Sequence, residues 1–179
     1  MGTARLANIK AIFTDVDGVL TDGRIILGAR LGDEFACFDV QDGVGQKLAE
    51  AAGLPVVWLT GRLSGAVAQR AKILKPAEVL RGRVDKVAAA EEWLRPRGLQ
   101  ISQIAYMGDD LIDIELLEKA GWSAAPSNAR REVKAAVSYV TKAHGGRGAF
   151  REAVETLLKK QGAWSAAMRE YLKNNKPMV

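Results

Sequence analysis

The chain has 179 residues, of which 48% are hydrophobic and 26% are charged, a composition typical of one soluble globular domain. No run of about 18 apolar residues occurs and the N-terminus lacks a signal-peptide pattern, so we expect no membrane partner and a cytoplasmic location. The net charge of +5 comes from scattered basic residues without a recognisable nucleic-acid-binding module, which favours a small anionic substrate or simple solubility over nucleic acid.

Apolar, strand-like runs alternate with helical patterns along most of the chain. In chain order we expect a strand at Lys10–Thr14, a helix at Gly43–Ala52, a strand at Pro55–Leu59, a helix at Ser64–Leu74, a strand at Glu78–Leu80, a helix at Val84–Arg97, a strand at Ile104–Met107, a helix at Leu111–Ala120, a strand at Trp122–Ala125, a helix at Ala129–Ala135 and a strand at Val137–Val140. This alternation predicts an α/β fold, a Rossmann-like parallel sheet with helices on both faces.

The segment between the first strand and the first helix breaks this rhythm. Gly23–Val40 has two β-prone arms around a glycine-containing turn, which predicts a β-hairpin insertion beside the first acidic loop. We therefore expect a single domain over residues 1–162, with the hairpin at about 23–40, and a C-terminal tail over residues 163–179. The tail has a short helical pattern that we expect to fray unless it docks on a neighbouring molecule.

Charged and polar residues follow the strands at their carboxyl ends, which is where open α/β sheets bind ligands. They are Asp15 and Asp17 after the first strand, Thr60, Gly61 and Arg62 after the second, Lys86 at the start of a helix, and Asp109, Asp110 and Asp113 after the strand at 104–107. Because these loops meet at one edge of the sheet, they predict a single site.

The residue types in these loops suit phosphoryl transfer. Asp15 would be the nucleophile and would form an aspartyl-phosphate, which splits the reaction into two easier steps. Asp17 would protonate the leaving oxygen and then take a proton from the attacking water. Thr60 would hold phosphate oxygens, and Lys86 would balance the charge of the phosphoryl group and of Asp15.

Several converging acids also call for a cation. Two carboxylates about 4 Å apart repel by roughly 4 kcal/mol at an effective dielectric constant of about 20. Asp109 would bind the cation together with Asp15, while Asp110 and Asp113 would support these metal ligands from the second coordination shell. Since the available ligands are oxygen atoms, without a converging His or Cys, we expect a hard ion, Mg²⁺ rather than zinc.

Each motif taken singly also has a structural interpretation. Asp15 and Asp17 could belong to a turn, Asp109 and Asp110 could cap a helix, and Lys86 could be a solvated lysine. All of them together, in order and at successive strand ends, favour a site over a coincidence of turns and caps.

The motifs resemble those of a known superfamily. The chain resembles the haloacid dehalogenase superfamily of phosphohydrolases through Asp15-Val-Asp17-Gly-Val-Leu-Thr-Asp22, Leu-Thr60-Gly-Arg62, Lys86 and Gly108-Asp109-Asp110-Leu-Ile-Asp113. Over about residues 8–162 it resembles the 3-deoxy-D-manno-octulosonate 8-phosphate phosphatase family, through two further segments, Phe38-Asp-Val-Gln-Asp-Gly-Val-Gly45 and Gly145-Gly-Arg147-Gly-Ala-Phe-Arg151-Glu152.

This resemblance implies hydrolysis of an eight-carbon keto-sugar phosphate in lipopolysaccharide precursor synthesis, with Mg²⁺ as cofactor and a homotetrameric assembly. It also implies that Asp17 binds the metal through its backbone carbonyl while its side chain does the acid–base work. Gly61, Arg62, Arg147 and Arg151 are the candidate substrate-binding residues. Arg62 could instead orient its loop, and Arg151 could belong to a structural ion pair.

Two departures from the family pattern concern the substrate rather than the chemistry. Ser127-Asn128 stands where the family often has Ala-Asp, and Leu63 stands where several members have a polar residue. Neither departure touches the four core motifs, so we expect the departures to bear on which sugar is bound and the chemistry to be conserved.

The spacing between the motifs leaves no room for a separate cap domain of about 50 residues or more. An open site would leave the phosphoryl group facing bulk water, which weakens each electrostatic contact. Our hypothesis is that the hairpin at Arg24–Phe38 pairs with hairpins of other subunits and overhangs a neighbouring active site. The alternative is a hairpin that packs on its own domain.

Three other functions are alternatives to hydrolysis of the eight-carbon sugar phosphate. A close relative acting on a nine-carbon nonulosonate 9-phosphate would share the chemistry and differ in its pocket. A signalling receiver domain also gathers acids, a Thr and a Lys, but it lacks Asp-x-Asp on its first strand. A catalytically silent binding domain is disfavoured because Asp15, Asp17, Thr60, Lys86 and Asp109 are all intact.

Overall fold

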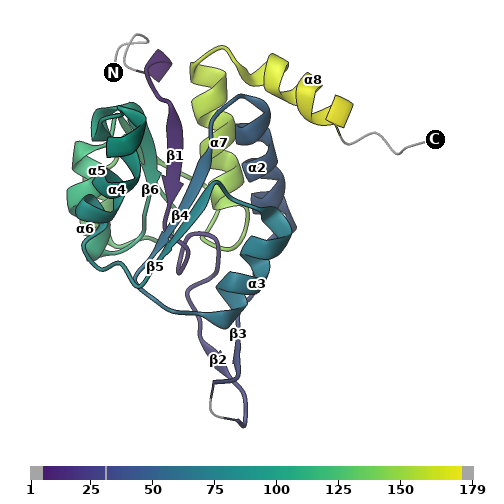
Figure 1. Ribbon diagram of the computed structural model, residues 1–179, viewed down its shortest axis with the longest axis vertical. Coiled ribbons are helices and arrows are strands. Elements are labelled where there is room, and N and C mark those ends of the chain that lie inside the picture. The colour runs from purple at the N-terminus through teal and green to yellow at the C-terminus, as the bar shows by residue number, and fades with distance from the viewer. Residues whose placement is uncertain (1–5, 31, 175–179) are drawn as a thin grey trace.

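The computed structural model describes residues 6–30 and 32–174, and its centre is a six-stranded sheet in the order β5-β4-β1-β6-β7-β8 (Figure 1). The strands are β1 (Ala11–Thr14), β4 (Val56–Thr60), β5 (Glu78–Arg81), β6 (Ile104–Met107), β7 (Trp122–Ala125) and β8 (Tyr139–Val140). Every neighbouring pair is parallel, and on β1 Phe13 lies opposite Val57 on one side and Tyr106 on the other. The predicted parallel α/β sheet is confirmed.

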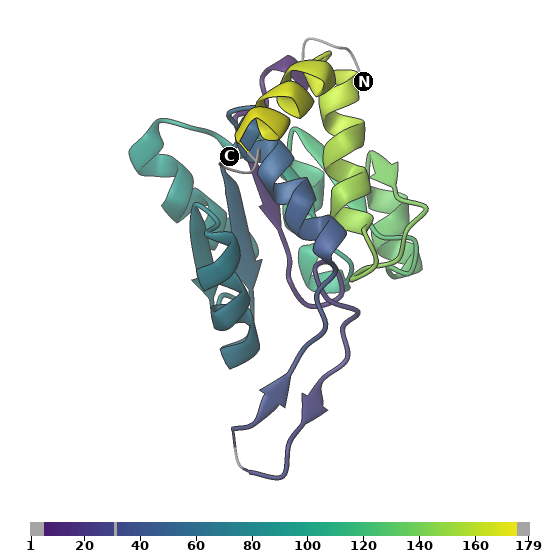
Figure 2. The same cartoon turned by 90° about the vertical axis from the view of Figure 1, so that its right-hand side faces the viewer.

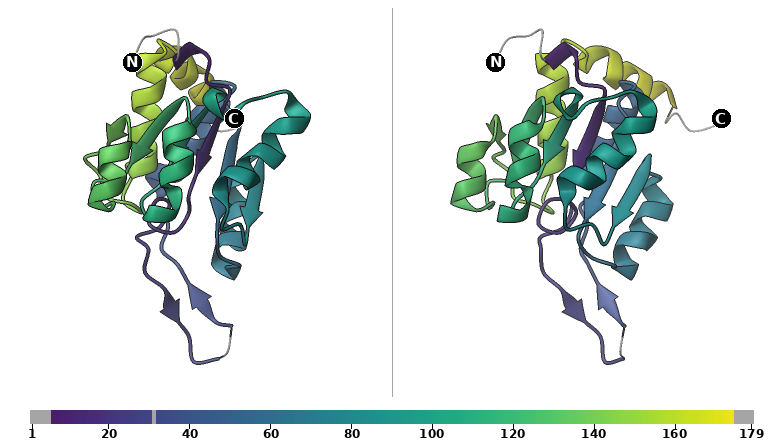
Figure 3. Two further views of the ribbon diagram at one scale, coloured as in Figure 1. Left: turned by 90° about the vertical axis from the view of Figure 1, so that its left-hand side faces the viewer. Right: turned by 60° about the vertical axis from the view of Figure 1, so that its left-hand side comes forward.

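Helices cover both faces of the sheet (Figure 3). They are α2 (Val40–Ala51), α3 (Gly65–Leu74), α4 (Lys86–Leu94), α5 (Ile114–Lys119), α6 (Arg131–Ala136), α7 (Ala149–Lys160) and α8 (Trp164–Asn174). On β1, Ile12 packs into the apolar cluster formed with α2, α3, α7 and α8, whereas Ala11 and Phe13 pack into the cluster formed with α4, α5 and α6. Alternate side chains are buried on opposite faces, which explains why the strands are continuously apolar.

Several helices differ from the predicted ranges because polar caps set their starts. The Asp39 carboxylate accepts a hydrogen bond from the amide of Gln41, so α2 begins earlier than the expected Gly43. Asp85 caps α4 in the same way, so this helix begins at Lys86 rather than at Val84. The expected helix at 111–120 is a 3-10 turn (Leu111–Asp113) followed by α5, and the expected helix at 84–97 ends in a 3-10 turn, Arg95–Arg97.

The C-terminal part of the chain packs on its own domain. Helix α7, which was not among the expected helices, lies beside α2, and α8 crosses both of them (Figure 2). Ala167 of α8 is buried, and Trp164 and Tyr171 pack against the same apolar cluster. The prediction that the tail frays is therefore wrong for residues 164–174, which form α8. Residues 175–179 of the predicted tail lie outside the described residues.

A thin hairpin extends from the carboxyl edge of the sheet (Figure 2). Its strands, β2 (Ile26–Leu27) and β3 (Glu34–Phe35), pair antiparallel, with Ile26 opposite Phe35. Among the described elements, no separate cap domain covers this edge. None of the helices in residues 6–30 and 32–174 is long and apolar enough to cross a lipid bilayer.

Candidate active site

Asp15 and Lys86 form a buried ion pair at the carboxyl edge of the sheet. Asp15 directly follows β1, and its Oδ2 atom lies 3.0 Å from Nζ of Lys86, the first residue of α4. Burial raises the pKa of the Asp15 carboxyl, and the positive charge of Lys86 opposes this shift. Burial acts to lower the pKa of Lys86, but the carboxylates of Asp15 and Asp113 raise it above its ordinary value. Lys86 therefore stays charged and favours the ionised Asp15 that a nucleophile requires.

Asp113 is completely buried, and donors surround its carboxylate. Its Oδ1 atom accepts hydrogen bonds from Nζ of Lys86 at 2.6 Å and from the hydroxyl of Tyr106. Its Oδ2 atom accepts from the backbone amides of Asp109 at 2.9 Å and Asp110 at 3.1 Å. Because both oxygens already accept hydrogen bonds, Asp113 positions Lys86 and the loop after β6.

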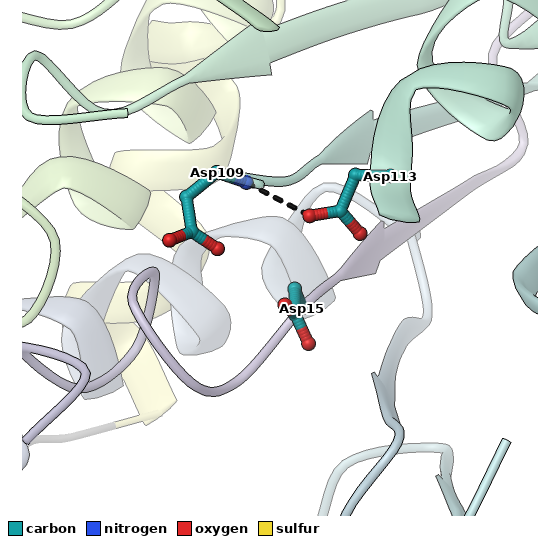
Figure 4. A group of neighbouring side chains, drawn as sticks. All are labelled: Asp15, Asp109 and Asp113. Atoms are coloured by element: carbon teal, nitrogen blue, oxygen red, sulfur yellow. Dashed lines mark hydrogen bonds between the residues drawn. The ribbon is translucent and has the colours of Figure 1, made fainter. Parts of the chain in front are cut away.

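The carboxylates of Asp15, Asp109 and Asp113 converge (Figure 4), with one oxygen of each within 4.8 Å of the other two. The Oδ1 atom of Asp109 is buried and has no hydrogen-bond partner among the described residues. Burial, followed by the charges of Asp113 and Asp110, raises the pKa of Asp109 to about 7. A buried carboxylate without a donor is costly unless a positive charge compensates it. The pair Asp15 and Asp109 therefore fits a hard divalent cation with oxygen ligands.

Gly18 allows the loop after β1 to approach Asp109. Its φ angle is +92°, and a methyl group on its Cα would lie 2.1 Å from Oδ2 of Asp109. Only glycine fits this position without moving Asp109. The loop after β1 therefore lies against the carboxylate of Asp109, and the metal contact of the Asp17 carbonyl stays a prediction.

The side chain of Asp17 is held by Thr60, the last residue of β4, and by Arg62 in the loop that follows. The hydroxyl of Thr60 donates to Oδ2 of Asp17 at 2.8 Å, and Nη1 of Arg62 lies 2.8 Å from Oδ1. The same hydroxyl accepts a hydrogen bond from the amide of Arg62 at 3.1 Å. The structure thus places Thr60 and Arg62 on the candidate acid–base group, and phosphate binding by Thr60 stays a prediction.

Glu34 on β3 is a site residue that the sequence analysis did not identify. Its Oε2 atom lies 2.8 Å from Nη2 of Arg62, and its Oε1 atom accepts a hydrogen bond from the hydroxyl of Ser64 at 2.6 Å. An acid on a hairpin arm is the one available signal in the sequence. That signal becomes informative only when the position of the hairpin relative to the loop after β4 is known.

The glycine-rich segment before α7 packs on the backbone of the loop that follows Asp17. A methyl group on Gly145 would lie 1.7 Å from the carbonyl oxygen of Gly18, and one on Gly146 would lie 2.4 Å from the amide nitrogen of Asp22. The amide of Gly145 donates to Oδ1 of Asn128 at 2.8 Å. Asn128, which belongs to one of the two departures from the family pattern, therefore holds the glycine-rich segment in place through this hydrogen bond.

The two arginines of the glycine-rich segment lie in different environments. Arg147 is exposed, and its charge contributes to lowering the pKa of Asp22, after the larger effect of the hydrogen bonds from Arg24. The Nε atom of Arg151 lies 2.6 Å from Oε1 of Glu155 on the same helix. Arg151 thus makes the structural ion pair that was considered as the alternative to substrate binding.

Two further predicted residues lie at the rim of the site. Asp110 is exposed, and its Oδ1 atom accepts a hydrogen bond from the amide of Leu111 at 2.7 Å, which caps the 3-10 turn before α5. Gly61 is exposed at the end of β4, and a methyl group there would meet only the carbonyl of Arg83, at 4.0 Å. Asp110 therefore acts on the local backbone, and Gly61 leaves open space beside Thr60.

Comparisons with known proteins agree with this geometry. The sequence model of the haloacid dehalogenase-like hydrolase family matches residues 68–151. The 3-deoxy-D-manno-octulosonate 8-phosphate phosphatase of Haemophilus influenzae is 38% identical over 176 residues, which are 97% of each chain.

Solved structures carry the same likeness. The crystal structure of the Moraxella catarrhalis phosphatase of that name, in complex with magnesium ion, phosphate ion and KDO, has a TM-score of 0.88 and 35% identity over 94% of this chain and 97% of that chain. The cobalt-bound Haemophilus influenzae phosphatase has a TM-score of 0.86 and 37% identity over 94% of this chain and 99% of that chain. The chain belongs to the haloacid dehalogenase superfamily and, within it, to the 3-deoxy-D-manno-octulosonate 8-phosphate phosphatase family.

Proposed function

We propose that the chain is a Mg²⁺-dependent phosphomonoesterase that hydrolyses 3-deoxy-D-manno-octulosonate 8-phosphate to the free sugar acid and phosphate, in lipopolysaccharide precursor synthesis. The observation that carries this proposal is the buried contact between Asp15 and Lys86 at 3.0 Å, beside an oxygen of Asp109 that has no hydrogen-bond partner in residues 6–30 and 32–174. A relative that matches over 97% of the chain and is named for this activity supports the substrate.

The residues support a two-step reaction. In the first step, a carboxylate oxygen of Asp15 forms a bond to phosphorus while the bond from phosphorus to the sugar oxygen breaks, and Asp17 gives that oxygen a proton. In the second step, Asp17 takes a proton from a water molecule as the water oxygen bonds to phosphorus and Asp15 leaves. Lys86 stays protonated throughout and stabilises the negative charge on Asp15 and the phosphoryl oxygens.

Asp15, Asp109 and the backbone carbonyl of Asp17 are the groups that would hold Mg²⁺. When bound, the ion would supply positive charge that offsets the repulsion between the carboxylates and the phosphoryl group. Asp113 and Asp110 support these ligands indirectly, because the backbone amides of Asp109 and Asp110 both donate to Asp113 and so hold the loop of Asp109 in place.

The proposed substrate-binding residues are Gly61, Arg62, Arg147 and Arg151, and they differ in how accessible they are to a substrate. Gly61 borders open space at the end of β4, and Arg147 is an exposed cation on a segment that packs against Gly18. Arg62 is half-buried between two carboxylates, so an anionic substrate would compete with them for its guanidinium. Arg151 could reach a substrate only after its ion pair with Glu155 opens.

We further propose a homotetramer in the cytoplasm, in which the hairpins contribute to neighbouring active sites. The hairpin exposes apolar side chains that its own domain does not cover, with Leu27 74% and Phe35 59% exposed. Deleting residues 25–36 should give monomers with poor turnover, as measured by light scattering and phosphate release. A deletion variant that stays tetrameric and fully active would contradict the assembly.

The catalytic proposal is tested by phosphate release from the eight-carbon substrate in the presence of Mg²⁺. Wild-type protein should release phosphate, and Asp15→Asn should lower kcat by at least about 1,000-fold because it removes the nucleophile. Glu118→Gln, which neutralises an exposed acid of α5 outside the hairpin, is the control and should retain wild-type turnover. Retained turnover in Asp15→Asn would remove the assigned nucleophile.

A further inference from the structure

One carboxylate of the hairpin reaches into the active site. Glu34 lies on β3, yet its two oxygens contact Arg62 at 2.8 Å and Ser64 at 2.6 Å, both in the loop between β4 and α3. Its side chain is only 20% exposed, although neighbouring hairpin residues such as Phe35 point into solvent. The contact joins segments that are 28 residues apart in the sequence.

Arg62 is held from two sides by this arrangement. Its Nη1 atom lies 2.8 Å from Oδ1 of Asp17, and its Nη2 atom lies 2.8 Å from Oε2 of Glu34. A planar guanidinium suits this task because its donors point in fixed directions and can bridge two carboxylates at once. The orientation of Arg62 therefore depends on Glu34 as well as on Asp17.

We propose that Glu34 is a positioning residue for the phosphatase reaction, which holds the guanidinium of Arg62 against the acid–base residue Asp17. This inference rests on the proposed function, because it assigns Glu34 a role in the chemistry of Asp17. Without the second carboxylate, Arg62 keeps a single charged anchor on a side chain with many rotamers. Asp17 would then lose one of the two donors that fix its carboxylate, the other being the hydroxyl of Thr60.

A purely structural role for Glu34 makes a different prediction. Ser64 is the N-cap of α3 and donates its hydroxyl to Glu34, so the carboxylate also ties the hairpin to that helix. If this tie were the whole role of Glu34, its loss would have the same effect whether or not Arg62 is present. If Glu34 acts through Arg62, its loss should matter only while Arg62 is there.

A double-mutant cycle separates these two roles. Glu34→Gln keeps the shape of the side chain and an oxygen for the hydroxyl of Ser64, but it removes the charge that faces Arg62. We expect Glu34→Gln to lower kcat about tenfold in the wild-type background and less than about twofold in the Arg62→Ala background. Glu118→Gln is the matched control, because it makes the same Glu-to-Gln change at an exposed position of α5, outside both the hairpin and the candidate site. It should change kcat by less than about twofold.

Three results would overturn the proposal. The first is a kcat for Glu34→Gln within about twofold of wild type, and the second is an equal loss in both backgrounds. The third is a different oligomer mass for Glu34→Gln than for wild type, measured by light scattering, because the loss of kcat would then arise from altered assembly. The cycle should be run on the eight-carbon sugar phosphate and on p-nitrophenyl phosphate. If wild type hydrolyses only the second compound, the proposed substrate is wrong, but the coupling between Glu34 and Arg62 is still measured.

Discussion

The ammonium group of Lys86 lies 2.6 Å from Oδ1 of Asp113, and the two side chains are 2% and 0% exposed. Lys86 also contacts the candidate nucleophile Asp15, at 3.0 Å. Asp113 in addition accepts hydrogen bonds from the amides of Asp109 and Asp110, so one carboxylate orients both the ammonium group of Lys86 and the loop that carries Asp109, the proposed metal ligand. The positions of Lys86 and Asp109 are therefore coupled through Asp113.

Removing the charge of Asp113 should impair both stability and turnover. Asp113→Asn leaves Lys86 with a single buried partner, and we expect a loss of roughly 3 kcal/mol in the free energy of unfolding. We also expect a fall of at least about 100-fold in kcat/KM. Urea unfolding and steady-state kinetics measure the two effects. Glu115→Gln, which breaks an exposed ion pair with Lys119, is the control and should change stability by less than about 0.5 kcal/mol.

Mg²⁺ should stabilise the folded protein through Asp109. The buried Oδ1 atom of Asp109, which has no hydrogen-bond partner within the described part of the chain, would gain a positive partner when the ion binds. At ten times the dissociation constant, Mg²⁺ should raise the free energy of unfolding by about 1.4 kcal/mol, and a chelator should abolish turnover. Asp109→Asn should lose the stabilisation while keeping the fold, and the exposed acid variant Glu118→Gln should keep it. Equal stabilisation of Asp109→Asn would place the ion elsewhere.

The glycine-rich segment should tolerate no side chain at Gly145. A methyl group there would lie 1.7 Å from the carbonyl oxygen of Gly18, in a contact between two backbones that cannot yield by a rotamer change. Gly145→Ala should therefore lower kcat/KM by at least about 100-fold, because it displaces the loop that carries Asp17. Gly65→Ala, at a helix position with open space around it, is the control and should be neutral or slightly stabilising. Similar kinetics for the two variants would contradict the packing.

Asp42 predicts a pH dependence of stability outside the catalytic centre. Its side chain is buried, with the residue 4% exposed, and its carboxylate accepts hydrogen bonds from the amides of Arg151 and Gly148. Burial raises the pKa of Asp42 to about 6, although the hydrogen bonds from those amides act to lower it. Because the ordinary value is 3.8, the folded protein holds a proton that the unfolded chain has released between these pH values. Stability contributed by Asp42 is therefore lost as the pH rises through about 6.

The sign can be measured by comparing wild type with Asp42→Asn, which cannot titrate. The free energy of unfolding of wild type minus that of Asp42→Asn should fall by roughly 2 kcal/mol between about pH 4 and about pH 7. Urea unfolding at several pH values gives this difference and cancels the other titrating groups. A difference that rises with pH would mean that the amides of α7 outweigh burial.

The sequence predicted the parts of the site that local strand ends determine. Asp15 and Asp109 each follow a continuously buried strand and Thr60 ends another, and parallel pairing of β1 with β4 and β6 brings those ends together. Lys86 was predicted at the start of its helix, where Asp85 caps it. In these cases hydrophobic pattern, cap and topology agree, which is why local reasoning succeeded.

The sequence could not predict contacts between distant segments. Glu34 reaches Arg62 only because of the way the hairpin leaves the domain, and no local pattern records that direction. Helix α7 was missed because its start lies in the glycine-rich segment, where Gly148 has a φ angle of +86°. The docking of α8 on α2 and α7 depends on apolar faces that become neighbours only after folding.

The most direct test of the account is the kcat/KM of the wild-type protein, with Mg²⁺, on 3-deoxy-D-manno-octulosonate 8-phosphate and on a nine-carbon nonulosonate 9-phosphate. We expect the kcat/KM for the eight-carbon substrate to exceed that for the nine-carbon substrate by at least about tenfold. A comparable or larger kcat/KM for the nine-carbon substrate would contradict it.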